Sequence, residues 1–155
     1  MKPLTYEQAL SRAASLCSGA EHCSSEIHKK LLLWGLSSTQ AEKAISYLTT
    51  EKYIDNKRFC RAYCLDKLRY NHWGRIKISQ MLRMMEMESN DISEGLEAIP
   101  EELYQDVLSH ILSQKNHQLH DADPYIRKGK LVRHALSRGF ETHLIMELLT
   151  DLCCE

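Results

Sequence analysis

The feature of this sequence that most constrains its fold is an apolar spacing that occurs three times. Apolar or small residues, with Glu86 as the one exception, recur at offsets 0, 4, 8, 9, 14, 18 and 21 from starts at Ile27, Ile78 and Leu131, which lie 51 and 53 residues apart. Offsets 0, 4 and 8 span only about 80° of a helix surface, so they predict one helix, and offsets 14, 18 and 21 predict a second. The three sets are Ile27, Leu31, Gly35, Leu36, Ala41, Ile45, Leu48; Ile78, Leu82, Glu86, Met87, Ile92, Leu96, Ile99; and Leu131, Ala135, Gly139, Phe140, Ile145, Leu149, Leu152.

Offsets 8 and 9 predict a tight turn between the two helices of each copy. Gly35 and Gly139 suit the left-handed residue that ends a helix, and Leu36 or Phe140 would then fold back onto that helix. Glu86 takes the same place in the second copy, so we expect that turn to be less favourable.

A further helix is predicted before each pair, over residues 5–18, 56–70 and 101–114, where apolar residues again form a stripe. No segment alternates with a period of two, so no sheet is expected. The sequence therefore predicts an all-α chain of three tandem three-helix modules that stack into an elongated, curved body. The expected modules are residues 1–54, 55–99 and 100–155.

Helix-capping residues fall where this scheme requires them. Thr5 precedes Gln8 by three residues and Thr39 precedes Glu42 by three, and both spacings predict a capping box. Asp55 is expected to cap the fourth helix. Two further starts are Pro100 followed by two glutamates, and Asp123 followed by Pro124.

Composition limits the class of protein. The chain is 43% hydrophobic and 26% charged, and no apolar run approaches the ~20 residues that span a bilayer. The first residues contain no apolar signal core, so we expect a cytoplasmic protein without a membrane partner. The six cysteines include no CxxC pair. In a reducing compartment they are expected to be free thiols rather than disulfides or zinc ligands, the pair Cys153 and Cys154 included.

Charge is unevenly distributed although the net charge is −1. Residues 52–85 carry nine basic and two acidic groups, and residues 86–110 carry eight acidic and no basic groups. This pattern predicts a dipole along the chain that could steer a polyanionic or bipolar partner. An ordinary set of solvated helix faces explains the same pattern equally well.

The basic block supplies a candidate binding face for phosphate or for an acidic protein groove. Within the predicted helix 56–70, Arg58, Arg61 and Arg69 fall within about 80° of one another. Trp73, in a polar turn, is the aromatic residue we expect to be exposed, where it could stack on a base; Tyr47, Tyr53 and Tyr63 are assigned to the core or its boundary. The complete face is Arg58, Arg61, Lys67, Arg69, Arg75, Lys77 and Arg83.

Motifs for catalysis are missing from the sequence. It contains no GxxxxGK[ST], no GxGxxG and no HExxH. The densest group of potential metal ligands is His117, His120, Asp121 and Asp123, which we interpret as a polar loop because metal sites need ligands held on rigid elements. We therefore expect no catalytic residue, no cofactor and no metal, and a hydrolase or metal enzyme is the least supported class.

Three segments resemble the RecX family. The central one is Tyr53-Ile54-Asp55-Asn56-Lys57-Arg58-Phe59-Cys60-Arg61-Ala62-Tyr63, which is similar to the family's central motif. The second is Gly74-Arg75-Ile76 through Leu82, and the third is Lys130 to Phe140 with its Arg138-Gly139-Phe140 turn. Together with the length and the three-module layout, the resemblance covers residues 5 to 152.

The resemblance implies a non-enzymatic regulator of the bacterial recombinase RecA. Such a protein binds RecA, lodges in the groove of its filament on DNA, and limits filament growth, ATP hydrolysis and strand exchange in recombination, DNA repair and the SOS response. Carried over by position, Arg58 and Arg75 belong to the basic face. The architectural positions are Phe59, Gly35, Gly74, Leu82, Gly139 and Phe140. We expect a monomer whose partners are the RecA filament and, inside it, single- or double-stranded DNA.

Two features differ from the family pattern. Glu86 stands where glycine is usual, and the total charge is near neutral rather than basic. The alternative is a direct DNA-binding protein that uses the basic second module as a helix-turn-helix-like reader.

Overall fold

The computed structural model describes residues 2–153, with side chains through Asp151, and contains nine helices and no strand in that range. The prediction of an all-α fold is confirmed. The repeat position Leu152 and the Cys153–Cys154 pair lie outside the described side chains. The helices are α1 (Tyr6–Gly19), α2 (Ser24–Leu33), α3 (Ser38–Thr50), α4 (Asn56–Asn71), α5 (Arg75–Met84), α6 (Ser89–Glu97), α7 (Glu101–Gln118), α8 (Pro124–Ser137) and α9 (Thr142–Cys153).

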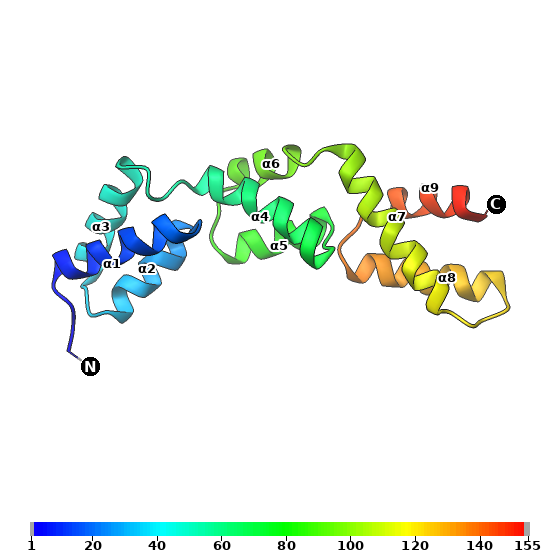
Figure 1. Ribbon diagram of the computed structural model, residues 1–155, viewed down its shortest axis with the longest axis horizontal. Coiled ribbons are helices and arrows are strands. Elements are labelled where there is room, and N and C mark those ends of the chain that lie inside the picture. The colour runs from blue at the N-terminus through cyan, green and yellow to red at the C-terminus, as the bar shows by residue number, and fades with distance from the viewer. Residues whose placement is uncertain (1, 154–155) are drawn as a thin grey trace.

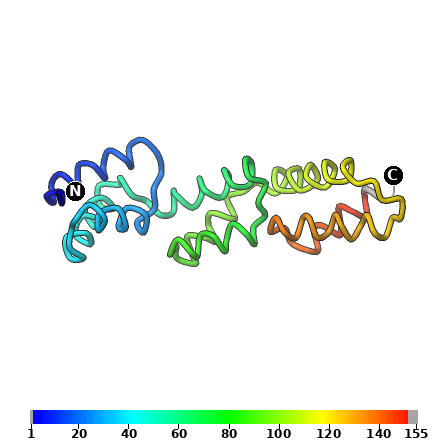
Figure 2. The backbone as a smooth tube through the Cα atoms, turned by 90° about the horizontal axis from the view of Figure 1, so that it is seen from below, coloured from blue at the N-terminus to red at the C-terminus, as the bar shows by residue number. Residues whose placement is uncertain are grey.

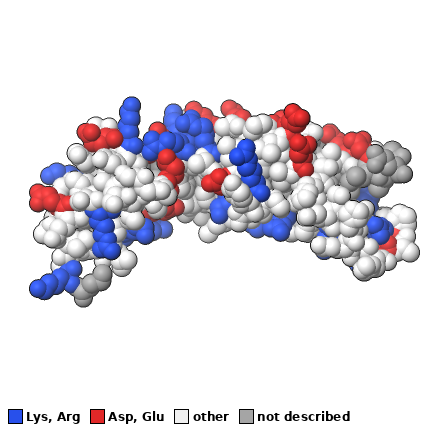
Figure 3. All heavy atoms as spheres, in the orientation of Figure 1, with Lys and Arg blue, Asp and Glu red and all other residues white. Residues whose placement is uncertain are grey.

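The helices follow one another in three groups along an elongated body, with the two ends of the chain at opposite ends (Figures 1 and 2). The body is arched (Figure 3). The second helix of each group, α2, α5 and α8, lies along the concave lower edge in Figure 1, whereas α6 and α9 lie along the convex upper edge. The predicted elongated, curved shape is therefore present.

The repeated apolar positions form the core. Ile27, Leu31 and Leu48 lie in one hydrophobic cluster that joins α1, α2 and α3. Ile78 and Leu131, which hold the same offset in the later copies, lie in a second cluster that runs continuously through α4 to α9. Burial of these stripes explains why the spacing predicted the helices. The module boundaries at residues 54/55 and 99/100 remain a prediction.

Three of the predicted side-chain caps are present in the structure. Thr5 accepts a hydrogen bond from the Gln8 backbone N–H at 3.2 Å, and Gln8 bonds back to Thr5, so this capping box is confirmed. Asp55 and Asp123 also cap their helices. The predicted cap at Thr39 is wrong, because Thr39 lies inside α3 and the capping box is formed by Ser37 and Gln40.

The turns between second and third helices contain left-handed residues. Gly35 has φ +104° and Gly139 has φ +91°. Glu86 holds the equivalent place with φ 64°, a conformation that an L side chain adopts only at a cost in free energy. The second turn is thus built like the other two, with a less suitable residue.

Each repeat copy contains a backbone carbonyl that accepts a hydrogen bond from an earlier segment of the chain. This carbonyl lies seven residues after the start of the copy. The Trp34 carbonyl accepts from the Leu4 N–H at 2.8 Å, and the Arg138 carbonyl accepts from the Gly74 N–H at 2.7 Å. The Met85 carbonyl accepts from the Ser25 hydroxyl at 2.6 Å. Each turn therefore docks onto earlier residues. The α5–α6 turn docks at the start of α2, and the α8–α9 turn docks at the start of α5. The Ser25–Met85 and Gly74–Arg138 contacts join successive helix groups, whereas the Leu4–Trp34 contact lies within the first group.

Four cysteines, Cys17, Cys23, Cys60 and Cys64, are free thiols, in agreement with the prediction. Burial raises the pKa of Cys60 to about 11 and that of Cys64 to about 12. Since the thiolate is the reactive form, only about one Cys60 in a thousand is reactive at pH 8. We expect iodoacetamide at pH 8 to leave both thiols unmodified in the folded protein and to modify them in urea, as measured by peptide mass spectrometry. Equal rates in the two states would contradict this burial.

Candidate binding surface

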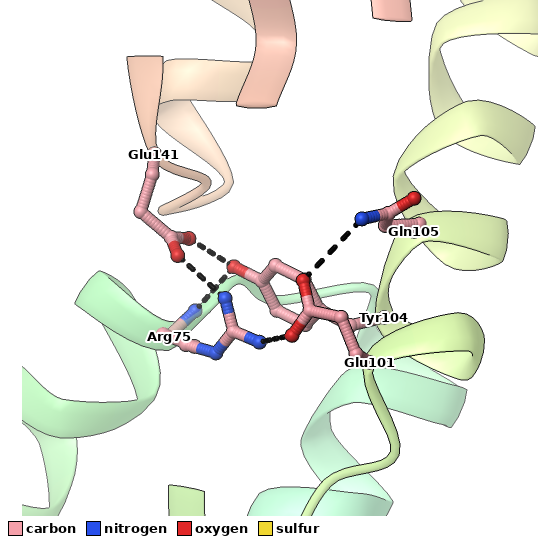
Figure 4. Close-up of polar contacts among 5 residues, drawn as sticks. All are labelled: Arg75, Glu101, Tyr104, Gln105 and Glu141. Carbon is pink, nitrogen blue, oxygen red and sulfur yellow. Dashed lines mark hydrogen bonds and ion pairs between the residues drawn. The ribbon is translucent and has the colours of Figure 1, made fainter. Parts of the chain in front are cut away.

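Arg75 lies at the center of a polar clasp between the middle and last helix groups (Figure 4). Its guanidinium donates to Glu141 at 2.6 Å and to Glu101 at 2.5 Å, and it stacks over the Tyr104 ring at 3.7 Å. The Tyr104 hydroxyl accepts from the Arg75 backbone N–H at 3.0 Å and donates to Glu141. Burial, and then the hydrogen bond to Glu141, raise the pKa of Tyr104. Arg75 thus has partners within the fold.

Close backbone contact surrounds this clasp. The Ile76 N–H donates to the Gly139 carbonyl at 3.0 Å, beside the Gly74–Arg138 hydrogen bond. A Cβ on Gly74 would lie 2.4 Å from the Gly139 carbonyl oxygen, and a Cβ on Gly139 would lie 2.4 Å from the Lys77 Cβ. Glycine at both positions is what permits the two groups to approach so closely.

Arg58 forms the corresponding contact between the first and middle groups. Its Nε lies 2.5 Å from a carboxylate oxygen of Glu21, which precedes α2. The Ser24 N–H also donates to the Asn56 side chain at 3.0 Å, and Asn56 donates back to the Ser24 hydroxyl. Like Arg75, Arg58 is held by an acidic residue from another part of the chain.

The expected exposure of Trp73 is wrong, because its ring is partly buried against the core of α4 to α9. The Lys67 ammonium lies 5.0 Å and the Lys77 ammonium 4.8 Å from the ring centroid. Both lysines are partly buried as well. The structure thus brings two residues of the predicted face together around an indole, which holds their charges through cation–π contacts.

The remaining members of the predicted face, Arg61, Arg69 and Arg83, are exposed. Arg61 and Arg69 lie on α4, and Arg83 lies on α5, where it donates to the Ser79 hydroxyl at 2.7 Å. Among the seven predicted residues, Arg58 and Arg75 form ion pairs within the fold, and Lys67 and Lys77 flank Trp73. The other three, Arg61, Arg69 and Arg83, are available to a partner. Their use in binding remains a prediction.

The second and third helices of the groups differ in charge. The body therefore has a charge polarity across its width as well as along its length. The second helices α2, α5 and α8 carry nine basic residues and one acidic residue. The third helices α3, α6 and α9 carry one basic and six acidic residues over their described lengths. In Figure 3, red atoms recur along the convex edge and blue atoms occur along the concave edge, although the largest group of blue atoms lies on the convex edge left of the middle.

The second helices also expose apolar side chains. Leu33 is 83% exposed, Met84 74% and Tyr125 84%. We call the exposed basic and apolar side chains of α2, α5 and α8, together with the partly exposed Lys77, the second-helix edge. Its basic members without an ion-pair partner in the described part of the chain are Lys29, Lys30, Lys77, Arg83, Lys128 and Arg133.

Four of these six residues, Lys29, Lys30, Lys128 and Arg133, were not among the predicted site residues. They lie outside the basic block of residues 52–85 and inside segments whose net charge is close to zero. Alignment of the three repeat copies would have found them, because it places α2, α5 and α8 in register.

In the group His117, His120, Asp121 and Asp123, only the two aspartates contact α8. His117 lies inside α7, so the predicted polar loop begins only after Gln118. Asp121 pairs with Lys130 at 2.7 Å, which lowers the pKa of Asp121, and Asp123 caps the helix. Arg127 donates to the backbone carbonyls of Leu119 and Asp121. Within the residues that the structure describes, no cluster of three or more histidine, cysteine, aspartate or glutamate side chains could hold a metal ion. None of the described helices has the length and apolarity needed to cross a bilayer.

Comparison with known proteins relates the whole chain to one family. No protein-family model matches the sequence. The regulatory protein RecX of Chlorobaculum tepidum is 27% identical over 139 residues, which are 90% of this chain and 84% of that protein. The crystal structure of RecX from Lactobacillus salivarius superposes with a TM-score of 0.88 over 97% of each chain at 15% identity, which shows a shared fold. The regulatory protein RecX of Prosthecochloris aestuarii is 30% identical over 147 residues, 94% of this chain and 93% of that protein. With this relative matched over nearly its whole length, the chain belongs to the RecX family of regulatory proteins.

Proposed function

We propose that this protein binds the RecA filament on DNA through its second-helix edge and limits filament growth, ATP hydrolysis and strand exchange. Membership of the RecX family supports regulation as the role, and the family resemblance of the sequence points to RecA. The observation that carries the binding mode is the excess of basic over acidic residues, nine to one, on the three second helices.

The form of the edge suits a long, repetitive, negatively charged target. Three helices from successive groups lie along one concave edge of the arched body (Figures 1 and 3). Exposed apolar side chains such as Met84 and Leu33 lie on the same helices as the basic groups. A surface of this kind gains both electrostatic attraction and apolar burial on binding, whereas the acidic third helices on the other side repel a polyanion.

A matched pair of double variants tests this proposal. Reversing the exposed edge residues with Lys30→Glu and Arg83→Glu is expected to raise the amount of protein needed for half-inhibition of RecA ATP hydrolysis on single-stranded DNA by about tenfold. The control, Lys43→Glu with Lys52→Glu, makes the same charge change at exposed positions outside the second helices and is expected to inhibit like the parent protein. Equal inhibition by both variants would contradict the edge as the binding surface.

The alternative of a helix-turn-helix reader in the middle module has less support from the fold. In that motif the second helix of the helix-turn-helix pair enters the major groove. Here that helix is α6, which contains Asp91, Glu94 and Glu97 and no basic residue. A filter-binding titration on bare duplex DNA at physiological salt separates the two functions. We expect weak binding without RecA, and tight, sequence-selective binding would favour the alternative.

A further inference from the structure

The same groove recurs beside the second helix in the first and last helix groups. In the first group, a cavity of about 300 Å³ is lined by Ser24, Ser25, His28 and Glu42. In the last group, a cavity of about 620 Å³ is lined by Lys128, Gly129, Val132 and Met146. The two sets of residues hold the same four positions in the repeat. Relative to the copy starts at Ile27 and Leu131, these positions are −3, −2, +1 and +15. In the middle group, Arg75 and Ser93 hold two of these positions in a cavity of about 400 Å³.

In the first two groups, the turn of the next group docks at this place. Glu86 lines the first groove, and the Ser25 hydroxyl binds the Met85 carbonyl beside it. At α5, Gly74 and Ile76 bind the Arg138 and Gly139 carbonyls, and the same turn places Glu141 against Arg75. The groove therefore receives a turn between two helices, and in the second case an acidic residue two positions after the left-handed glycine.

Within the described residues, nothing from this chain docks on the groove between α8 and α9 in the same way. Tyr125 on its rim is 84% exposed, and Ile126 and Met146 are 45% and 38% exposed. Lys128 and Arg133 line it, no acidic residue does, and neither basic residue has an ion-pair partner in the described part of the chain. Lys128 holds the repeat position at which Arg75 binds Glu141.

We propose that this groove, which we call the α8–α9 groove, binds a partner protein that inserts a turn between two helices, with a carboxylate directed at Lys128. The partner's carboxylate takes the place that Glu141 takes against Arg75, and an apolar residue of the turn fills the space between Ile126, Val132 and Met146. Lys128 and Arg133 also belong to the second-helix edge, and the proposal goes beyond the proposed function by assigning a turn of an acidic protein to the groove between α8 and α9. Binding to this groove is measured without RecA, so the two proposals can fail separately.

The occupant is a different protein rather than a second copy of this chain. All three turns of the chain are already covered, by Leu4, by Ser25 and by Gly74. A nucleic acid satisfies the basic rim, but its polar sugar–phosphate backbone and flat bases fill a groove lined by isoleucine, valine and methionine side chains less well than a branched aliphatic side chain does. An acidic helical turn satisfies both the charge and the apolar lining.

The donors differ from those at α5. Gly74 precedes α5, so its N–H is free to bind the incoming turn, whereas the equivalent Arg127 lies inside α8 and its N–H binds the Asp123 carbonyl at 3.0 Å. The side chains of Lys128 and Arg133 are therefore the groups that bind the partner. For this reason we expect recognition to depend on the acidic residue of the turn.

A synthetic peptide tests this site. The probe is a fluorescein-labelled peptide with the sequence of residues 131–149 of this chain, which carries the Gly139 turn and Glu141, titrated with the full chain at low salt and followed by fluorescence anisotropy. We expect saturable binding, about fivefold weaker for Lys128→Glu and for a peptide with Glu141→Gln. Gly129→Arg is expected to abolish binding. Lys43→Glu changes an exposed lysine on α3, outside both the groove and the second-helix edge, and is expected to bind like the parent chain.

The Gly129→Arg variant is expected to fold, because the three atoms nearest to a Cβ at Gly129 belong to the flexible end of Arg133, at 3.4 to 3.9 Å, and circular dichroism checks this. Absence of saturable binding at millimolar peptide, or binding that Gly129→Arg leaves unchanged, overturns the proposal. Two further results would assign the groove to another occupant and also overturn it. They are self-association of the chain that Gly129→Arg removes, and binding of a thymidine oligonucleotide that Gly129→Arg removes.

Discussion

Replacing Gly74 by alanine is expected to lower the free energy of unfolding by about 3 kcal/mol. A Cβ at this position would lie 2.4 Å from the Gly139 oxygen and 2.5 Å from the Gly139 carbonyl carbon and the Phe140 nitrogen. All three are backbone atoms, so no side chain can rotate away. Gly74 has an ordinary φ of −82°, and the cost therefore arises from the contact and not from backbone strain.

Urea denaturation followed by circular dichroism measures this effect, and Gly19→Ala is its matched control. A Cβ on Gly19 has no neighbour within 4 Å, so the same substitution there is expected to change the free energy of unfolding by less than about 0.5 kcal/mol. If Gly74→Ala were as stable as Gly19→Ala, the close docking of the α8–α9 turn onto the start of α5 would be wrong.

Replacing Arg75 by alanine is expected to cost about 2 kcal/mol of stability, because it leaves two carboxylates and a buried tyrosine without their common partner. The Arg75 side chain is only 24% exposed, and Glu141 is 21% exposed, so water replaces little of the lost interaction. The more exposed Glu101 contributes less. Loss of the stacking on Tyr104 adds to the effect.

Arg69→Ala is the control for this substitution, since Arg69 is exposed on α4 and has no ion-pair partner in the described part of the chain. Thermal and urea denaturation of the two variants are expected to separate them clearly. If Arg75→Ala and Arg69→Ala were equally stable, the stabilising role of Arg75 would be wrong, and Arg75 would be available for binding a partner.

The helices and turns could be predicted from the sequence because their cause is local. A stripe such as Ile27 and Leu31 must be buried whichever segment covers it, and a left-handed turn favours glycine at Gly35 and Gly139. The one capping error has the same origin. Ser37 with Gln40 and Thr39 with Glu42 have identical spacing, and only the backbone conformation shows that the helix begins after Ser37.

The roles of Arg58 and Arg75 could not be read from the sequence, because their partners are distant along the chain. Glu21 lies 37 residues from Arg58, and Glu141 lies 66 residues from Arg75. A helical angle places an arginine on a face of its own helix, but it does not show which other segment packs against that face. Arg58 and Arg75 were expected to bind a partner, but each forms an ion pair between two helix groups. Sequence spacing alone did not reveal this packing between groups.

The second-helix edge was missed for a related reason. A sum of charges along residues 52–85 combines α4 and α5, whereas the structure aligns α5 with α2 and α8 along one edge (Figure 1). Lys30 and Lys128 are assigned to one surface only when residues are compared by their position within the repeat. Charge in a repeat protein is therefore better counted by position within the repeat than by position in the chain.

An electron cryomicroscopy reconstruction of this protein bound to RecA filaments on single-stranded DNA tests the central claim most directly. The proposed binding mode requires α2, α5 and α8 to face the filament, with Lys30 and Arg83 at the contact and α6 and α9 directed away from it. A reconstruction in which the acidic third helices make the contact, or in which only one helix group touches the filament, would contradict it.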